Sequence, residues 1–337
     1  MKILHCIPIL DAAGGAERQL SYLAAELAKR GHEVHVAFVE RGGHAATPAG
    51  VTLHDVGAHG NYDPRIVLNL IRLMRTIRPD VVQTNLMQMD VLGGIAALLT
   101  CTPWIVREPN AAPAYPPGWK TSVRRMLGAR AAAIVSNSRG GDAYWRGART
   151  RYVITNGVPF DEIGTADPDA ANVVLFAGRM TEGKNAATVV AALARLNIDF
   201  TAVFCGDGPL RRELERTAGP RVVFTGVVTD LWERMRRAAV VVSLSRFEGC
   251  PNVVMEAMAC GVPLVVSDIP AHRELLGDGA ALFVDAGDAA AAAKAIEATL
   301  RDRPAAHARA HAARARVAHC SIDALARQYE EVYRNHA

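Results

Sequence analysis

The chain has 337 residues and a formal net charge of +4, with 50% of its residues hydrophobic and 21% charged. This length suffices for two domains of ordinary size, and the composition is that of a globular protein rather than a disordered or fibrous one. The charge is unevenly spread, because residues 1–160 hold 18 Lys/Arg against 11 Asp/Glu and the remaining residues hold 20 against 23. A basic first half suggests a polyanionic or membrane-surface partner on that side, with ordinary solvated charge as the alternative. We expect no nucleic-acid partner.

The six cysteines are widely spread and form no C-x-x-C pair, so neither a zinc site nor a thiol redox motif is indicated. A reducing cytoplasm is the simplest setting for them, and we predict a cytoplasmic location. A strand-like run follows Met1 at once, so we expect no signal peptide. The longest uncharged run, residues 91–106, is too short for a membrane-spanning helix and contains Pro103.

Strand-like apolar runs alternate with helical patterns along the first half of the chain. After a first strand near residues 3–7, we expect strands at residues 34–38, 81–83, 104–106, 133–136 and 152–155. Apolar residues recur with helical spacing over 20–27 and 66–77, and these helices are expected to end near Gly31 and Pro79. Such alternation is typical of parallel sheets covered by helices on both faces.

The alternation stops at residues 157–161 and resumes at Asn172. Strands are then expected at residues 173–177, 201–205, 222–225, 240–244, 264–267 and 281–284. The alanine-rich run 289–318 and the amphipathic run 322–333 are expected to be helices. We therefore predict a first domain over residues 1–158, a polar linker over 159–171, a second domain over 172–320 and a final helix within 321–337.

Two glutamates eight positions apart, Glu248 and Glu256, are the most informative feature. The first follows a strand in a Gly/Pro-broken loop, and the second lies on a helix predicted to begin near Pro251. The unpaired amides at the start of such a helix attract phosphate. Two carboxylates beside them suit the ribose and sugar hydroxyls of a nucleotide-sugar. The alternative is that the pair only caps and solvates the helix.

This stretch closely resembles the E-x7-E signature of retaining GT-B glycosyltransferases of the family-4-like group. The resemblance implies two doubly wound Rossmann-like α/β domains facing a central cleft, with the last helix crossing back to the first domain. It also implies that Glu248 contacts the donor sugar and that Glu256 contacts the ribose. Pro251, Asn252 and Val253 would then bind the donor at the start of the helix.

Other segments resemble the same family. Residues 176–185 are similar to its G-R-x…K segment, so the resemblance makes Arg179 and Lys184 catalytic, as cations that stabilise charge on the leaving diphosphate. They would remove the need for a metal, and we expect neither a metal nor another cofactor. The Asp167-Pro168-Asp169 sequence lies in the predicted linker and is discounted as a metal ligand. Gly206 and Val228 lie in stretches that resemble those near the nucleotide.

The glycines of Ala12-Ala13-Gly14-Gly15-Ala16-Glu17 follow the first strand and open the first helix. The segment is not the G-x-G-x-x-G of a dinucleotide site, and it resembles the GG-x-E loop of the family. That resemblance implies donor contacts for Gly14 and Gly15 and an acceptor-side role for Glu17. A plain strand-to-helix turn is the alternative.

The sequence departs from the family pattern after the strand near residue 105. Many relatives have a His there, near the sugar, whereas this chain reads Arg107-Glu108-Pro109-Asn110. We expect Arg107, Glu108 or Asn110 to serve on the acceptor side, and which of them replaces the His is left open.

A short basic segment follows the Pro113–Pro117 loop. Trp119, Lys120, Arg124 and Arg125 fit an amphipathic helix that would favour an anionic membrane surface, together with Arg130. An anionic glycan at the acceptor site is the alternative partner of these cations.

The resemblance implies a retaining glycosyltransferase that moves a sugar from a UDP- or GDP-sugar to a glycan or lipid-linked glycan in surface-polysaccharide or lipopolysaccharide biosynthesis. A GT-B epimerase acting on UDP-sugars is one alternative. A non-catalytic sugar-nucleotide-binding partner subunit is another, although the intact Arg179, Lys184 and glutamate pair argue against it. The expected location is cytoplasmic, with peripheral attachment to the inner face of the plasma membrane.

Overall fold

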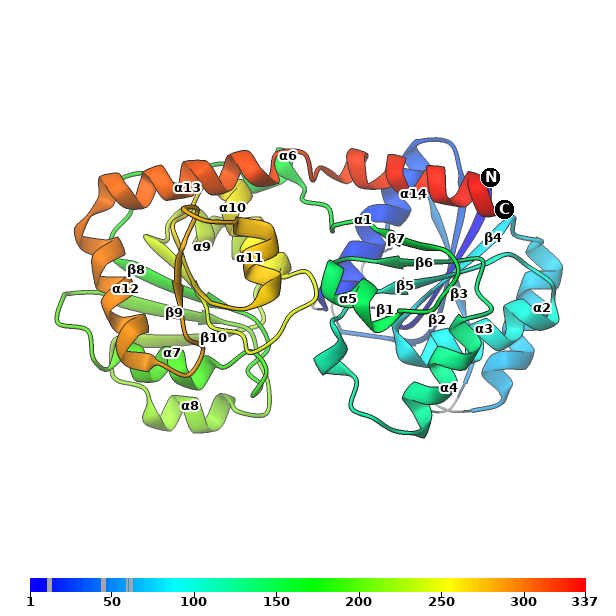
Figure 1. The fold of residues 1–337 in the computed structure, drawn as a ribbon, viewed down its shortest axis with the longest axis horizontal. Helices are drawn as coiled ribbons and strands as arrows, with labels where there is room; N and C mark the ends of the chain where they lie inside the picture. Colours follow the sequence, from blue (N-terminus) through cyan, green and yellow to red (C-terminus); the bar gives the residue numbers. More distant parts are fainter. Residues whose placement is uncertain (11–13, 44–46, 59, 61–62) are drawn as a thin grey trace. The chain divides into compact units, whose positions relative to one another are not determined.

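The computed structural model describes residues 1–10, 14–43, 47–58, 60 and 63–337 (Figure 1). The chain forms two compact units. The first unit contains Met1–Gly157 and Ile322–Ala337, and the second contains Val158–Ser321. Each unit has its own parallel sheet and its own apolar cores.

The first unit is built on a seven-stranded parallel sheet with the order β3-β2-β1-β4-β5-β6-β7. Its strands are β1 (Lys2–Leu10), β2 (Glu33–Arg41), β3 (Val51–Asp55), β4 (Val81–Asn85), β5 (Trp104–Glu108), β6 (Ala133–Ser136) and β7 (Arg151–Val153). The strand order reverses between β1 and β4, which is where ligands usually bind in such sheets. The edge strand β3 was not predicted, because none of its five side chains is fully buried and its apolar pattern is weak.

Helices cover both faces of this sheet. They are α1 (Gly15–Lys29), α2 (Arg65–Ile77), α3 (Leu86–Leu99), α4 (Trp119–Gly128), α5 (Arg139–Tyr144) and α14 (Ile322–His336), with a 3-10 turn at Ala112–Ala114. Apolar residues of α1 and α14 share one core, with Leu23 and Tyr329 among its buried members. Those of α2 and α3 share another core with Trp104, against which α4 packs through Leu127.

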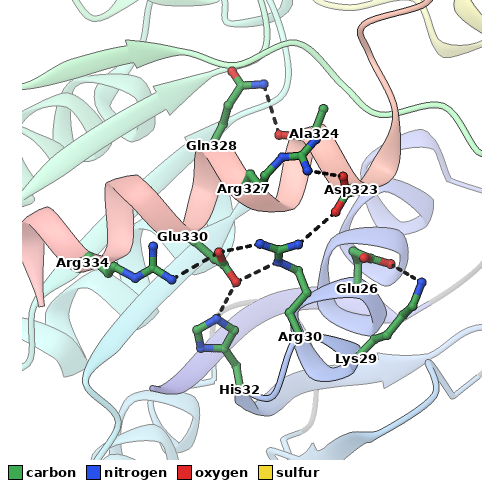
Figure 2. A network of polar contacts seen from close by, with 10 residues as sticks. All are labelled: Glu26, Lys29, Arg30, His32, Asp323, Ala324, Arg327, Gln328, Glu330 and Arg334. Atoms are coloured by element: carbon green, nitrogen blue, oxygen red, sulfur yellow. Dashed lines mark hydrogen bonds and ion pairs between the residues drawn. The ribbon is translucent and has the colours of Figure 1, made fainter.

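The last helix, α14, is fastened to the end of α1 by ion pairs (Figure 2). The guanidinium of Arg30 donates to both oxygens of Glu330 at 2.8 and 2.9 Å and to Asp323 at 2.9 Å. His32 Nε2 lies 2.8 Å from Glu330 Oε1. These contacts lower the pKa of the buried Glu330 to about 2, chiefly through the hydrogen bonds from Arg30. The C-terminal helix is thus part of the first unit, although the second unit intervenes in the sequence.

The second unit has a six-stranded parallel sheet with the order β10-β9-β8-β11-β12-β13. The strands are β8 (Val173–Ala177), β9 (Thr201–Cys205), β10 (Val222–Gly226), β11 (Val240–Ser243), β12 (Leu264–Ser267) and β13 (Leu282–Val284). The helices are α6 (Phe160–Ile163), α7 (Ala186–Leu193), α8 (Arg211–Thr217), α9 (Leu231–Arg236), α10 (Asn252–Cys260), α11 (Pro270–Leu276), α12 (Ala289–Arg301) and α13 (Arg303–Val317).

One expectation about this unit was wrong. Residues 159–171 are not a linker, because they pack into the second unit through the buried Ile163 and through backbone hydrogen bonds to Arg236 and Cys260. The alanine-rich run is helical, as predicted, and it is divided into α12 and α13. Asp302 ends α12 and caps α13 by accepting a hydrogen bond from Ala305, and Pro304 cannot donate the amide that a continuous helix needs.

Within the described part of the chain, the helices are all too short or too polar to span a bilayer.

Candidate active site

Two strand-to-helix turns lie against each other at the carboxyl edge of the second unit's sheet. Gly178 follows β8 with φ 149°, and Gly206 and Gly208 follow β9 with φ 129° and 158°. A Cβ on Gly206 would lie 2.1 Å from the Gly178 carbonyl oxygen, so only glycine permits this approach. The turns are joined by backbone hydrogen bonds from Gly178 to Cys205 and from Met180 to Asp207. The predicted nucleotide-binding Gly206 therefore has a definite role in shaping this edge.

Helix α10 begins at the same edge, after β11. It spans Asn252–Cys260 and is preceded by Pro251, which confirms the predicted start. Glu256 lies on this helix and is buried. The amides of Asn252 and Val253 are in the first turn, at the end of the helix that favours phosphate.

Lys184 and Glu248 meet although 64 residues separate them. Lys184 Nζ lies 2.5 Å from Glu248 Oε1, and the Ser245 hydroxyl donates to the same oxygen at 2.7 Å. The Glu248 side chain is 12% exposed and that of Lys184 37% exposed. The structure thus brings two of the three predicted catalytic residues into direct contact.

Asn185 holds the lysine segment in place. It adopts a left-handed backbone conformation, and its side-chain amide donates to the carbonyls of Leu244 and Ala286 at 2.9 and 2.6 Å. The Arg246 amide also donates to the Gly183 carbonyl at 2.8 Å. The segment that carries Lys184 is therefore tied to the one that carries Glu248.

His272 is linked to this region through Ser267. It is fully buried, its Nδ1 lies 2.8 Å from the Ser267 carbonyl, and the Ser267 hydroxyl donates to the Ser245 carbonyl. Burial is the main cause that lowers the pKa of His272. Asn185, Ser245 and Ser267 were not singled out from the sequence, although Ser245 and Ser267 lie at the ends of predicted strands, where ligand-side residues gather.

Arg179 and Val228 are not part of this contact. Arg179 is exposed on the turn after β8 and, within the described residues, has no carboxylate partner. Val228 follows β10, is half-buried and packs on the core that includes Val254.

In the first unit, Gly14 precedes α1, and a Cβ there would lie 1.9 Å from Glu17 Oε2. The carboxylate of Glu17 therefore folds back over Gly14, and Gly15 begins the helix. Ala12 and Ala13 of the same motif lie outside the described residues.

The positions of Arg107 and Glu108 differ from those expected for residues on the acceptor side. Both are buried in the first unit, where their side chains bond to other residues of that unit. Arg107 donates to Asn156 at 3.0 Å, and Glu108 accepts from Tyr115 at 2.6 Å and from Trp145 at 3.0 Å. Asn110 is half-buried and donates its side-chain amide to the Tyr115 hydroxyl.

The predicted membrane contact of Arg124 is wrong, because its side chain is not exposed. It is completely buried between Asp90, at 2.7 Å, and Glu108, at 2.8 Å, and its guanidinium lies over the rings of Tyr115 and Trp145. Burial raises the pKa of Asp90 to about 6 against the opposing effect of Arg124. Helical spacing predicted that Arg124 lies beside Arg125 on one face of the helix. It could not predict that two buried carboxylates from distant segments, Asp90 and Glu108, pair with Arg124. Trp119, Lys120 and Arg125 are exposed as predicted.

Across the described residues, three or more His, Cys, Asp or Glu side chains nowhere gather in a way that could hold a metal ion. Asp167 accepts a hydrogen bond from the Asp169 amide, as in a local turn.

Comparison with known proteins assigns the family. The family described as Glycosyltransferase Family 4 matches residues 13–162, and that described as Glycosyl transferases group 1 matches residues 171–302. The chain belongs to the family-4-like, group 1 glycosyltransferases. An alpha-1,4-N-acetyl-D-galactosaminyltransferase of Campylobacter jejuni, whose name specifies a glycan on PP-undecaprenol, is 28% identical over 90% of this chain and 89% of its own length. A lipopolysaccharide core biosynthesis glycosyltransferase of Rhizobium meliloti is 28% identical over 86% of both chains.

Some similarities to this glycosyltransferase are local. A second Campylobacter jejuni transferase is 32% identical, but the match spans only 37% of this chain and 37% of that relative.

The crystal structure of Anabaena HepE with UDP and glucose is similar over 99% of this chain and 100% of its own, with a TM-score of 0.87 and 22% identity. The fold is therefore GT-B, as predicted.

Proposed function

We propose that this glycosyltransferase moves a sugar, with retention of anomeric configuration, from a UDP-sugar to a lipid-linked or other glycan acceptor in surface-polysaccharide biosynthesis. The observation that supports this best is the meeting of Lys184 and Glu248 at the sheet edge where α10 begins. A cation, a carboxylate and the amides at the start of a helix are what a sugar diphosphate needs. The names of the Campylobacter and Rhizobium relatives support the acceptor class. The UDP bound to the Anabaena protein supports the donor class.

The proposed reaction takes place on one face of the donor sugar. The bond from the anomeric carbon to the phosphate oxygen breaks, and its electron pair leaves with the diphosphate. The acceptor oxygen bonds to the same face of that carbon, and its proton passes to the departing phosphate oxygen. Arg179, Lys184 and the Asn252 and Val253 amides stabilise the charge on the diphosphate, and no metal is required. Glu248 orients the sugar and Glu256 the ribose.

Incubation with a panel of UDP-, GDP- and ADP-sugars, followed by measurement of released nucleotide and sugar products, tests this function. We expect release of UDP that increases with a glycan or lipid-linked acceptor. A changed sugar nucleotide without release of UDP would indicate an epimerase instead. Binding of a sugar nucleotide with no turnover under any acceptor would indicate a non-catalytic subunit.

The finer location that we propose is peripheral, on the inner face of the plasma membrane, through the outer surface of α2, α3 and α4. Together these helices contain one carboxylate, Asp90, and it is buried. Exposed cations of α2 and α4 share this surface with exposed Leu68, Leu99, Trp119 and Met126. These cations are Arg72, Arg75, Lys120 and Arg125, whereas Arg65 is paired with Asp63 at 2.6 Å. Basic residues of α14 are paired with Asp323 and Glu330 (Figure 2). Each cation near an anionic bilayer adds about 1 kcal/mol of attraction.

Co-sedimentation with vesicles that contain an anionic phospholipid tests this location. Wild-type protein should sediment at low salt and be released by added salt. The Arg72→Glu/Arg125→Glu variant should stay in the supernatant. Arg327→Glu, on α14, is the control and should sediment like wild type. Wild-type protein that stays in the supernatant at low salt would rule out the membrane surface, and the transferase function would be unaffected. Retention on an anionic glycan instead would assign these cations to the acceptor.

A further inference from the structure

The contact between Lys184 and Glu248 occupies groups that the proposed function assigns to the donor. Oxygen Oε1 of Glu248 accepts from both Lys184 and Ser245, so the carboxylate is already satisfied on that side by residues of the chain itself. Its low exposure means that little water solvates it. The lysine assigned to the diphosphate is therefore neutralised by the carboxylate assigned to the sugar.

This pair is held by the fold and is not a casual surface ion pair. The lysine segment is fixed by the Asn185 side chain and by the bond from Arg246 to Gly183. The glutamate segment is supported by Ser245, whose carbonyl accepts from Ser267. Because both backbones are tied down, the carboxylate cannot easily retreat when an anion approaches Lys184.

A free nucleoside diphosphate and a complete donor then meet different environments. The phosphates of the free nucleotide must share Lys184 with an ionised carboxylate, and the two anions repel each other at short range. A complete donor also brings sugar hydroxyls, which donate to Glu248 and compensate for its weakened contact with Lys184. Carboxylate repulsion thus acts mainly on the nucleotide that lacks a sugar.

We propose that Glu248 is a specificity-determining residue, which weakens the binding of the free nucleoside diphosphate relative to the nucleotide-sugar by competing for Lys184. This inference rests on the proposed function, because it assumes that Lys184 binds the diphosphate. Its consequence is that the product nucleotide leaves more readily once the sugar has been transferred.

Calorimetric titration with UDP, GDP and UDP-glucose tests the proposal on the full chain. Glu248→Gln removes the charge but keeps the shape, so UDP or GDP should bind at least about 5-fold more tightly than to wild type. UDP-glucose should not bind more tightly, so the preference for the donor should shrink. Glu182→Gln is the matched control, because Glu182 is an exposed carboxylate two residues before Lys184. Its affinities should stay within about 2-fold of wild type. Thermal melting checks the fold, and Glu248→Ala should shift UDP affinity in the same direction if Glu248→Gln folds poorly.

The possible results distinguish failure of this inference from failure of the proposed transferase function. Equal or weaker binding of the free nucleotides to both Glu248 variants, with clear binding to wild type, would overturn the competition and leave the transferase function standing. If UDP and GDP also bind more tightly to Glu182→Gln, the loss of any nearby negative charge would explain the effect. That result would also overturn the proposed competition. No binding of any nucleotide or UDP-glucose to any form would overturn the donor site together with the inference.

Discussion

At the scale of single residues, the chemistry is concentrated where Lys184 meets Glu248. The motif resemblance predicted both residues, and the structure adds the contact between them. Sequence spacing could not predict the buried cluster of Asp90, Glu108 and Arg124, because its members come from three separate segments and polar residues are expected at the surface. Glu108 was expected on the acceptor side because it lies where many relatives have a His, whereas its side chain is internal to the first unit.

The cation of Lys184 should be required for turnover. Lys184→Ala should lower the rate of nucleotide release by about 100-fold or more, the effect expected when one contact to the developing charge is lost. Lys294→Ala, at an exposed position of α12, is the control and should be near wild type. Activity should persist in EDTA. A strict requirement for a divalent ion would show that the diphosphate is not held by side chains and amides alone.

Glu256 should determine affinity for the nucleotide itself. If its carboxylate accepts the ribose hydroxyls, Glu256→Ala should weaken UDP binding about 10-fold or more, since a hydrogen bond to a charged group is lost. Titration with UDP measures this directly. The opposite shifts expected for Glu256→Ala and Glu248→Gln make the two assignments separable, and a similar loss in both variants would contradict them.

At the scale of elements, the site depends on tight turns and on where helices begin. The start of α10 was predictable from Pro251, whereas the division between α12 and α13 depends on one cap, Asp302, within a run whose composition favours continuous helix. The back-to-back turns after β8 and β9 were predicted only as separate glycine motifs. Their mutual contact depends on the pairing of β8 with β9, which a local pattern does not contain.

Gly206→Ala should destabilise the second unit by at least about 2 kcal/mol. The side chain would require a strained backbone conformation and would collide with the Gly178 carbonyl. Gly219→Ala is the matched control, because nothing lies within 4 Å of a Cβ there. Denaturant unfolding of both variants measures the difference. Equal stabilities would show that the two turns can separate without cost.

The ion pairs that fasten α14 should make the first unit sensitive to acid. The folded pKa of Glu330 is lowered to about 2, below its ordinary value near 4.5. Its contribution is therefore fully present above about pH 4.5 and is lost as the pH falls toward 2. Glu330→Gln should cost about 1 kcal/mol at pH 7 after allowance for solvent screening, and nothing near pH 2.

Thermal melts across pH 2–7 test this dependence. Glu331→Gln is the control, because Glu331 is the exposed neighbour of Glu330. A constant difference between Glu330→Gln and wild type at every pH would contradict the assignment.

At the scale of the whole molecule, the alternation of strands and helices was enough to predict two parallel α/β units. Every strand of the described residues except β3 was anticipated in outline. The edge strand β3 was missed because its side chains are only partly buried and its sequence therefore lacks a clear apolar pattern. The polar composition of residues 159–171 suggested a linker, yet the backbone of this segment is bonded to the second unit. A polar composition indicates that side chains favour solvent, but it does not show which backbone groups form hydrogen bonds with the rest of the unit.

The central claim is that the second unit binds a nucleoside diphosphate at the edge where Lys184, Glu248 and the start of α10 meet. Hydrogen–deuterium exchange with and without saturating UDP tests it most directly. We predict slower exchange of backbone amides in residues 178–185, 206–209 and 249–255, with little change in α12 and α13. Unchanged exchange in these three segments, or protection confined to another part of the chain, would contradict the account.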